Sequence, residues 1–160
     1  MRAALRSACT DLLAAARPED GTVENGEVEV LVSTMVAGNR ELIAGLNNDP
    51  QFGLTIMLGI GGILAEAIRD VTFRLVPITE IDAAEMIDDL ATQRLLGEFR
   101  GEPEVDRGAL ISALVALAAV GQQEDGIVSL DLNPLIIVDG SPMAVDALLE
   151  IDDNAESVPR

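Results

Sequence analysis

Three oxygen-bearing side chains near the C-terminus have the residue types and spacing of a metal site. Asp131 and Asn133 lie two residues apart in a stretch whose composition predicts a β-strand, so both point to the same face. A hairpin would then bring Asp146 back beside them. Three oxygen ligands suit Mg²⁺, which takes few protein ligands and completes its shell with water and phosphate oxygens. Spacing alone equally allows three polar residues on the solvent face of an edge hairpin.

A glycine-rich turn is the second candidate feature. Gly59, Gly61 and Gly62 follow a predicted strand, and glycines in such a turn allow a backbone to approach a phosphate closely. No helix follows at the Rossmann spacing and no Lys is present, so neither dinucleotide-binding motif nor P-loop is matched. A tight hairpin connection would explain the same glycines.

Arg74 is the third candidate. It lies between Phe73 and Leu75 in a predicted strand and therefore points to the face opposite theirs. A guanidinium there could bind a phosphate or a carboxylate. Pairing with Glu66 or Asp70 across a hairpin is the alternative.

The charge of the chain limits its partners. There are 28 acidic and 10 basic residues, all ten of them Arg, which gives a net charge of −18. Such a chain is repelled by nucleic acid and by anionic membranes, and three Phe without Tyr or Trp provide no base-stacking surface. We therefore expect no nucleic-acid or membrane partner. The charge itself indicates a solvated acidic surface, and either a halophilic source or a GC-rich genome would explain the absence of Lys.

Missing residue types exclude several mechanisms. Without His these residues offer no Ser-His-Asp triad, imidazole metal ligand or phosphohistidine. Without Lys they offer no Schiff base and no P-loop lysine. Cys9 is a lone cysteine in an Ala-rich stretch and is interpreted as a small core residue. No apolar run is long enough for a membrane span and the N-terminus does not resemble a signal peptide, so the cytoplasm is the expected location.

Hydrophobic periodicity predicts an α+β domain with a largely antiparallel sheet flanked by helices. The predicted helices cover 2–16, 79–90, 92–96 and 106–121, with Thr79 and Asp106 as N-caps. The predicted strands cover 28–36, 41–46, 54–58, 128–138 and 143–149, and 63–75 is interpreted as a hairpin although 63–68 also has helical propensity. The polar tail 152–160 is expected to be flexible.

Several of these segments together resemble one family. They are similar to the ATP-grasp domain of ADP-forming acyl-CoA synthetases, which is related to the succinyl-CoA synthetase β subunit. The resembling segments are 41–45, 49–53, 57–66, 70–77, 130–135 and 145–147, and they follow the family order. An ordered series is far more specific than any single motif, and it favours the metal site over the polar hairpin.

The resemblance implies a C-terminal ATP-grasp subdomain within residues 1–151, with Mg²⁺ and ATP or ADP as cofactors. It assigns Mg²⁺ to Asn133 and Asp146, and it places Asp131 near the metal, facing an incoming phosphohistidine. The residues that would contact adenine through their backbone are Ser33, Thr34, Met35 and Val36. The residues that would lie where the phosphohistidine loop docks are Gly59, Gly61, Gly62 and Glu66.

The chain also departs from the family. Ser33 and Thr34 replace a usual Gln-Glu or Gln-Pro, Asn48 stands where Arg is common, and the family's phosphate-binding Lys and phosphorylated His are absent. The resemblance thus implies the nucleotide- and Mg²⁺-binding half of an enzyme that catalyses acyl-CoA + ADP + phosphate ⇌ acid + CoA + ATP. CoA-binding and phosphohistidine-bearing domains or a subunit would complete it, with or without homo-oligomerisation. The alternative is a non-catalytic ATP-grasp remnant that serves as a binding or regulatory module.

Overall fold

The computed structural model describes residues 2–15, 30–62, 68–124 and 126–152, and the chain divides into two compact units, Met1–Met35 and Val36–Arg160. In the first unit, α1 (Arg2–Ala15) confirms the predicted helix, with its Leu5 and Leu12 exposed and Cys9 half-buried. The strand predicted for 28–36 is wrong over the described residues 30–36, which pair with no strand. β-propensity favours an extended chain but cannot supply the partner that a strand requires.

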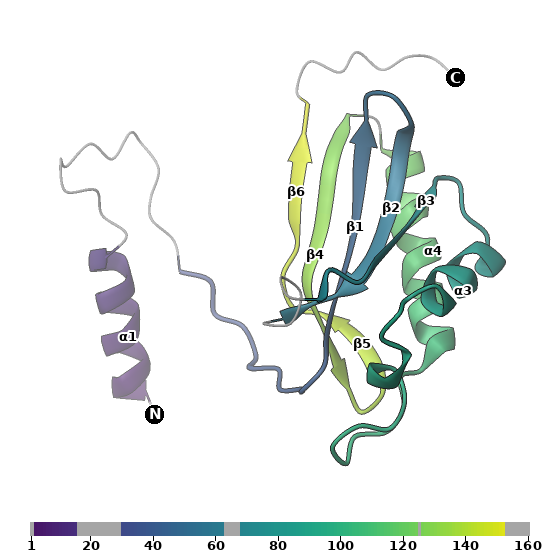
Figure 1. The fold of residues 1–160 in the computed structure, drawn as a ribbon. Helices are drawn as coiled ribbons and strands as arrows, with labels where there is room; N and C mark the ends of the chain where they lie inside the picture. The colour runs from purple at the N-terminus through teal and green to yellow at the C-terminus, as the bar shows by residue number, and fades with distance from the viewer. Residues whose placement is uncertain (1, 16–29, 63–67, 125, 153–160) are drawn as a thin grey trace. The chain divides into compact units, whose positions relative to one another are not determined.

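The second unit is built on an antiparallel sheet of six strands, which confirms the predicted fold class (Figure 1). The strand order is β3-β2-β1-β4, and both β5 and β6 pair with the far edge of β4. The strands are β1 (Glu41–Asp49), β2 (Gly53–Ile60), β3 (Val71–Leu75), β4 (Ile127–Val138), β5 (Ser141–Ala144) and β6 (Leu148–Ile151).

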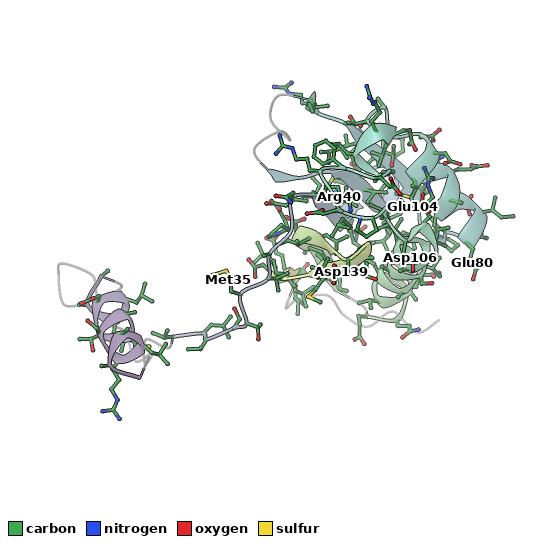
Figure 2. The ribbon with its side chains drawn as sticks, turned by 90° about the horizontal axis from the view of Figure 1, so that it is seen from below. Met35, Arg40, Glu80, Glu104, Asp106 and Asp139 are labelled. Atoms are coloured by element: carbon green, nitrogen blue, oxygen red, sulfur yellow. The ribbon has the colours of Figure 1, made fainter. Side chains whose placement is uncertain are left out.

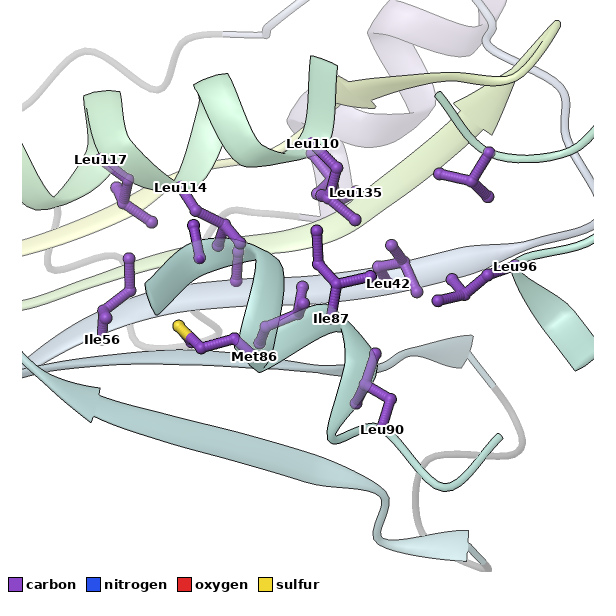
Figure 3. Packing of buried hydrophobic residues seen from close by; sticks show 14 of the residues in the cluster. Leu42, Ile56, Met86, Ile87, Leu90, Leu96, Leu110, Leu114, Leu117 and Leu135 are labelled. Atoms are coloured by element: carbon purple, nitrogen blue, oxygen red, sulfur yellow. The ribbon is translucent and has the colours of Figure 1, made fainter. Parts of the chain in front are cut away.

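The remaining elements of this unit cover one face of the sheet (Figure 1). They are α3 (Glu80–Asp88), the 3₁₀ turn η2 (Gln93–Leu95) and α4 (Arg107–Gln123). Figure 3 shows side chains of α3 and α4 packed onto those of the strands. The largest fully buried side chains are Leu42, Ile56, Leu58, Met86, Ile87, Leu90, Leu110, Leu114 and Ile137. No described element of the unit covers the opposite face, which we call the open face.

The helix starts follow from capping residues that the sequence had indicated. Thr79 Oγ1 accepts the Asp82 N–H at 3.2 Å while the Asp82 carboxylate accepts the Thr79 N–H at 2.7 Å, which forms a reciprocal capping box. The side-chain and backbone hydrogen bonds from Thr79 hold the pKa of Asp82 below its usual value. Asp106 caps α4 by accepting the Ala109 N–H at 2.9 Å.

Several predicted boundaries need correction. β1 continues through 47–49, beyond the predicted end of the strand at residue 46, and the turn lies at 50–52. The strand predicted over 143–149 is two short strands, β5 and β6, separated at 145–147. Residues 63–67 of the predicted hairpin and 153–160 of the predicted tail lie outside the described residues. Ile68 is helical, so the helical alternative holds at that position.

A buried carboxylate ties β3 to the turn after α3. Asp70 is only 8% exposed, and its two oxygens accept the Ala91 and Thr92 N–H groups at 2.9 and 2.7 Å. Burial raises the pKa of Asp70, but the hydrogen bonds from Thr92 and Ala91 together outweigh it and leave the pKa below its ordinary value. Asp70 is thus a structural anchor rather than a partner of Arg74.

A buried arginine, which the sequence analysis did not single out, fixes the start of the sheet. Arg40 is 4% exposed and lies within the second unit (Figure 2). Its Nε forms an ion pair with Glu102 Oε2 at 3.1 Å, and its remaining nitrogens donate to the carbonyls of Leu95, Gly97 and Pro103. The loop 95–103 is therefore held against the beginning of β1.

Within the described residues, no helix is both long enough and apolar enough to cross a membrane.

Candidate metal centre on the open face of the sheet

The alternation of β4 places Asp131 on the open face. Leu130 and Leu132 pack against the core, where they pair with the buried Leu46 and Ala44 of β1. The residue between them must point the other way. Asp131 therefore faces outward, as the sequence predicted.

A β-bulge keeps Asn133 on that same face. Ala44 pairs with Leu132 but Leu42 pairs with Leu135, so β4 carries one extra residue between these pairs. The extra residue returns Leu135, 3% exposed, to the core, while Asn133 stays exposed beside Asp131. Without the bulge, the one-residue change of phase would turn Leu135 and Ile137 outward.

Asp146 lies opposite Asn133. Asp131 pairs with Leu148 of β6, and Leu135 pairs with Ala144 of β5. The same number of residues therefore separates the two pairs on each side, without an insertion. Position 146 is therefore aligned with position 133, and side chains directly opposite in antiparallel strands face the same side. The register thus aligns positions 133 and 146, with Asp131 two residues away, and the role of the three residues as metal ligands stays a prediction.

This donor set fits Mg²⁺. Asp131 is half-exposed and both Asn133 and Asp146 are exposed, so two carboxylates and one amide oxygen border solvent. A hard cation that retains several waters prefers such a sparse set of oxygens, with phosphate oxygens as further ligands. The described residues contain no group of three or more His, Cys, Asp or Glu side chains that could hold a metal. The candidate set here has only two carboxylates, and its third oxygen belongs to the amide of Asn133.

A hollow of about 710 Å³ extends from Asp131 along the open face. That size lies within the usual range for small-molecule sites. Its polar side includes Asn47 and Ser129, which pair across β1 and β4, and its apolar side includes Phe73 and Leu75, exposed by 55% and 57%. The exposed apolar side chains can pack against the planar part of a small molecule. A cation held by the nearby carboxylate and amide oxygens can bind its anionic part.

Gly45 leaves room for Asp131. A methyl group on Gly45 would lie 2.9 Å from the Leu130 carbonyl and 3.4 Å from Asp131 Oδ1. Any larger side chain would press on the carboxylate. Sequence reasoning missed Gly45, Asn47 and Ser129, although the two-residue alternation of β1 and β4 was the signal that could have found them.

Arg74 is among the residues that line the hollow at Asp131, but its guanidinium is engaged by α3. Nη2 contacts Asp89 Oδ2 at 2.6 Å and Glu85 Oε2 at 3.7 Å, and Nη1 donates to the Phe73 carbonyl at 2.9 Å. The hydrogen bond with Asp89 raises the pKa of Arg74. Arg74 thus binds carboxylates, but not that of Asp70, which was one partner of the alternative pairing, because the Asp70 oxygens accept backbone N–H groups.

The glycines of the predicted turn have local roles in packing. A methyl group on Gly59 would lie 2.6 Å from Val71 Cγ1, and Gly62 has φ +70°. Gly61 donates its N–H to the Glu41 carbonyl at 2.8 Å. Gly61 and Gly62 line a second hollow, at the end of the sheet, rather than the metal centre.

The predicted adenine-contacting stretch is divided between the two units. Ser33, Thr34 and Met35 belong to the first unit, whereas Val36 begins the second. Glu66 lies outside the described residues. The nucleotide-contacting and catalytic roles of these residues stay predictions.

Comparison with known proteins identifies the family. A model of the ATP-grasp domain matches residues 1–151, and the chain therefore belongs to the ATP-grasp family. It is 42% identical over 109 residues to the acetate–CoA ligase (ADP-forming) II β subunit of Pyrococcus furiosus, covering 68% of this chain and 46% of that subunit. It is 37% identical over 128 residues to acetate–CoA ligase (ADP-forming) I of Archaeoglobus fulgidus, covering 79% of this chain and 19% of that enzyme.

Solved structures agree with this assignment. The dinucleotide-forming acetyl-coenzyme A synthetase 1 of Ca. Korarchaeum cryptofilum, solved with coenzyme A and Mg-AMPPCP, has a TM-score of 0.67 and 42% identity. The match covers 74% of this chain and 55% of that one. In that structure the phosphohistidine segment points towards the nucleotide-binding site. The 160 residues thus span about half of these subunits and about a fifth of the longer ligase.

Proposed function

We propose that the open face binds Mg²⁺ and ADP or ATP as the C-terminal part of the nucleotide site of an ADP-forming acyl-CoA synthetase. The observation that carries the proposal is the register that aligns Asn133 with Asp146 and leaves Asp131 on the same face. The family match and the relatives, all ligases that form acyl-CoA, support it.

Asn133 and Asp146 would hold the cation that neutralises the nucleotide phosphates. Bound Mg²⁺ supplies charge stabilisation for phosphoryl transfer. Asp131 would accept the remaining N–H of an incoming phosphohistidine and so orient the imidazole. In the transfer, the P–N bond to the imidazole breaks and a P–O bond to the terminal oxygen of ADP forms.

Other domains or a partner subunit would supply what these residues do not contain. The 160 residues have no His to carry the phosphoryl group and no Lys to bind phosphates. We therefore place the phosphohistidine, the CoA site and a Lys-bearing subdomain in further domains of the same polypeptide or in a partner subunit. The identity of the acyl group would be determined there.

Calorimetric titration of ADP into the chain tests the proposal, with Mg²⁺ in one arm and EDTA in the other. We expect binding that requires Mg²⁺, because the exposed oxygens and the nucleotide phosphates share the cation. Equal binding in both arms would contradict the proposal, because the oxygens of the metal centre would then have no part in holding the nucleotide.

A further inference from the structure

The outward side of α4 carries no charged residue. The buried leucines of the helix, among them Leu110 and Leu114, face the sheet, and Ser112 and Ala116 are exposed on the opposite side. After its first residue, Arg107, α4 contains no charged residue, although 24% of the whole chain is charged. The solvent side of a surface helix ordinarily carries charged and polar residues. A partner can therefore cover α4 without removing a charge from water.

A groove of about 470 Å³ runs between α4 and α3. It is lined by Ile81 and Ala84 of α3 and by Ile111 of α4, and Ile81 is 72% exposed. Gly108 and Ser112 line the groove on the α4 side. These two small residues are four positions apart and therefore lie on one ridge of the helix, where a further helix can approach closely. The groove thus has the apolar lining and the shape of a helix-docking site.

Acidic side chains border this groove. Glu80, Glu85 and Asp88 line it, and Figure 2 shows Glu80 at the outer edge of the second unit. The other acids of α3 and of the neighbouring helix caps are Asp82, Asp89 and Asp106. Glu80 forms no ion pair with any described residue. Its charge is therefore available to a partner.

The arginines nearby do not cancel the acidic charge. Arg107 pairs with Asp88, and Arg74 contacts Asp89 at 2.6 Å and Glu85 at 3.7 Å. On the neighbouring turn η2, Arg94 forms no ion pair within the described chain. Even with all three arginines counted, the six acids outnumber them. The groove is thus apolar along its length and net negative at its border.

A second copy of this chain does not match that charge. Two chains with a net charge of −18 repel each other, and α4 of a second copy would bring the same acidic α3 with it. An occupant that fits has an apolar ridge with basic side chains beside it. The proposed function places further domains or a partner subunit next to these residues, and this chain matches only 46% and 19% of the length of two relatives.

We propose that the groove between α3 and α4 docks a basic amphipathic helix of the other domains or of the partner subunit. The inference rests on the proposed function and names the surface by which the rest of the synthetase attaches. Apolar side chains of the docked helix pack against Ile81 and Ile111, and Lys or Arg side chains beside them reach Glu80 and Glu85. Because α3 and α4 cover the side of the sheet opposite the open face, the docked helix leaves the metal centre accessible (Figure 1).

Hydrogen exchange of the complete synthetase, with all its domains or subunits, tests the docking. We expect the backbone amides of α3 and of residues 108–116 to exchange at least about tenfold more slowly there than in the 160-residue chain. The reason is that a docked helix suppresses local opening of the two helices. Equal exchange in the complete synthetase and in the chain would overturn the docking role.

Ser112→Arg obstructs the groove. Ser112 Oγ donates to the Gly108 carbonyl of its own helix at 2.9 Å, and Arg has a higher helix propensity than Ser, so the unit keeps its fold. The long side chain occupies the groove and repels a basic partner, and we expect the exchange difference to disappear. Ser141→Arg is the matched control, since Ser141 is an exposed serine that does not line the groove. Retained protection in Ser112→Arg, or equal loss in both variants, would overturn the docking site.

The double change Glu80→Gln and Glu85→Gln tests the charge of the docked helix. We expect the protection at low salt to fall about threefold and its dependence on KCl to flatten, because two screened attractions are removed. Unchanged protection with unchanged salt dependence would show that the partner is not basic and would overturn the proposal.

Calorimetry with Mg²⁺ and ADP on the complete synthetase separates this inference from the proposed function. Ser112→Arg should bind Mg²⁺-ADP as the wild type does, because the groove does not lie on the open face. Equal exchange together with intact Mg²⁺-ADP binding would overturn the docking role alone. A complete wild-type synthetase that binds no Mg²⁺-ADP would instead contradict the proposed function.

Discussion

Asp146→Asn is expected to weaken Mg²⁺-dependent ADP binding by at least about tenfold. The amide preserves the shape of the side chain and one oxygen, but it removes a negative charge from the position opposite Asn133. Because the cation is shared with the nucleotide phosphates, a weaker cation site lowers nucleotide affinity. Calorimetric titration at fixed Mg²⁺ measures the effect.

Asp139→Asn is the control for this variant. Asp139 is an exposed carboxylate of the same C-terminal hairpin, and its φ of +48° is one that Asn adopts readily. The variant removes the same charge from a residue that does not lie opposite Asn133. The Mg²⁺-dependent affinity for ADP should therefore stay within about twofold of the wild type. Equal weakening in both variants would indicate general electrostatics instead of a ligand at Asp146.

Replacing the buried Arg40 with Leu is expected to lower the free energy of unfolding by about 3 kcal/mol or more. The change removes the ion-pair partner of the Glu102 carboxylate and the N–H donors to the carbonyls of Gly97 and Pro103. The loop 95–103 would then lose its attachment to β1. Urea unfolding followed by circular dichroism measures the loss.

Arg107→Leu provides the comparison for Arg40. Its ion pair with Asp88 lies at the surface, with both side chains substantially exposed. Surface pairs of this kind contribute about 0–1 kcal/mol, so the control should change stability little. Similar losses in the two variants would show that the burial of Arg40 has no special role.

Local sequence patterns predicted which residues form the candidate metal centre. Alternation placed Asp131 and Asn133 on one face of a strand, and the turn before Met143 indicated that the chain returns past them. The bulge at Asn133 could not be predicted, because it depends on how β4 pairs with β1, which is distant in sequence.

Arg40 and Arg74 show why other features escaped prediction. Nothing in the local sequence singled out Arg40, because its carbonyl partners lie on a loop more than fifty residues away. Arg74 was correctly assigned to a face, but its partner Asp89 is contributed by a helix packed on that face. Pairing of this kind is set by tertiary packing, and no periodicity in the sequence reports it.

The unit Met1–Met35 illustrates the opposite failure. The β-branched stretch at 28–36 has strong strand propensity, yet residues 30–36 find no strand partner within the described chain. Propensity indicates that a segment can adopt the extended conformation of a strand. Whether it forms a strand depends on a hydrogen-bonded neighbour.

Paramagnetic broadening of backbone amide signals by Mn²⁺ tests the central claim most directly. Mn²⁺ replaces Mg²⁺ in oxygen sites and broadens the signals of nearby nuclei. With ADP present, the account predicts selective loss of the amide signals of Gly45, Asp131, Asn133 and Asp146. Broadening centred instead on the acidic residues of α3, with the β4 and Asp146 signals intact, would contradict it.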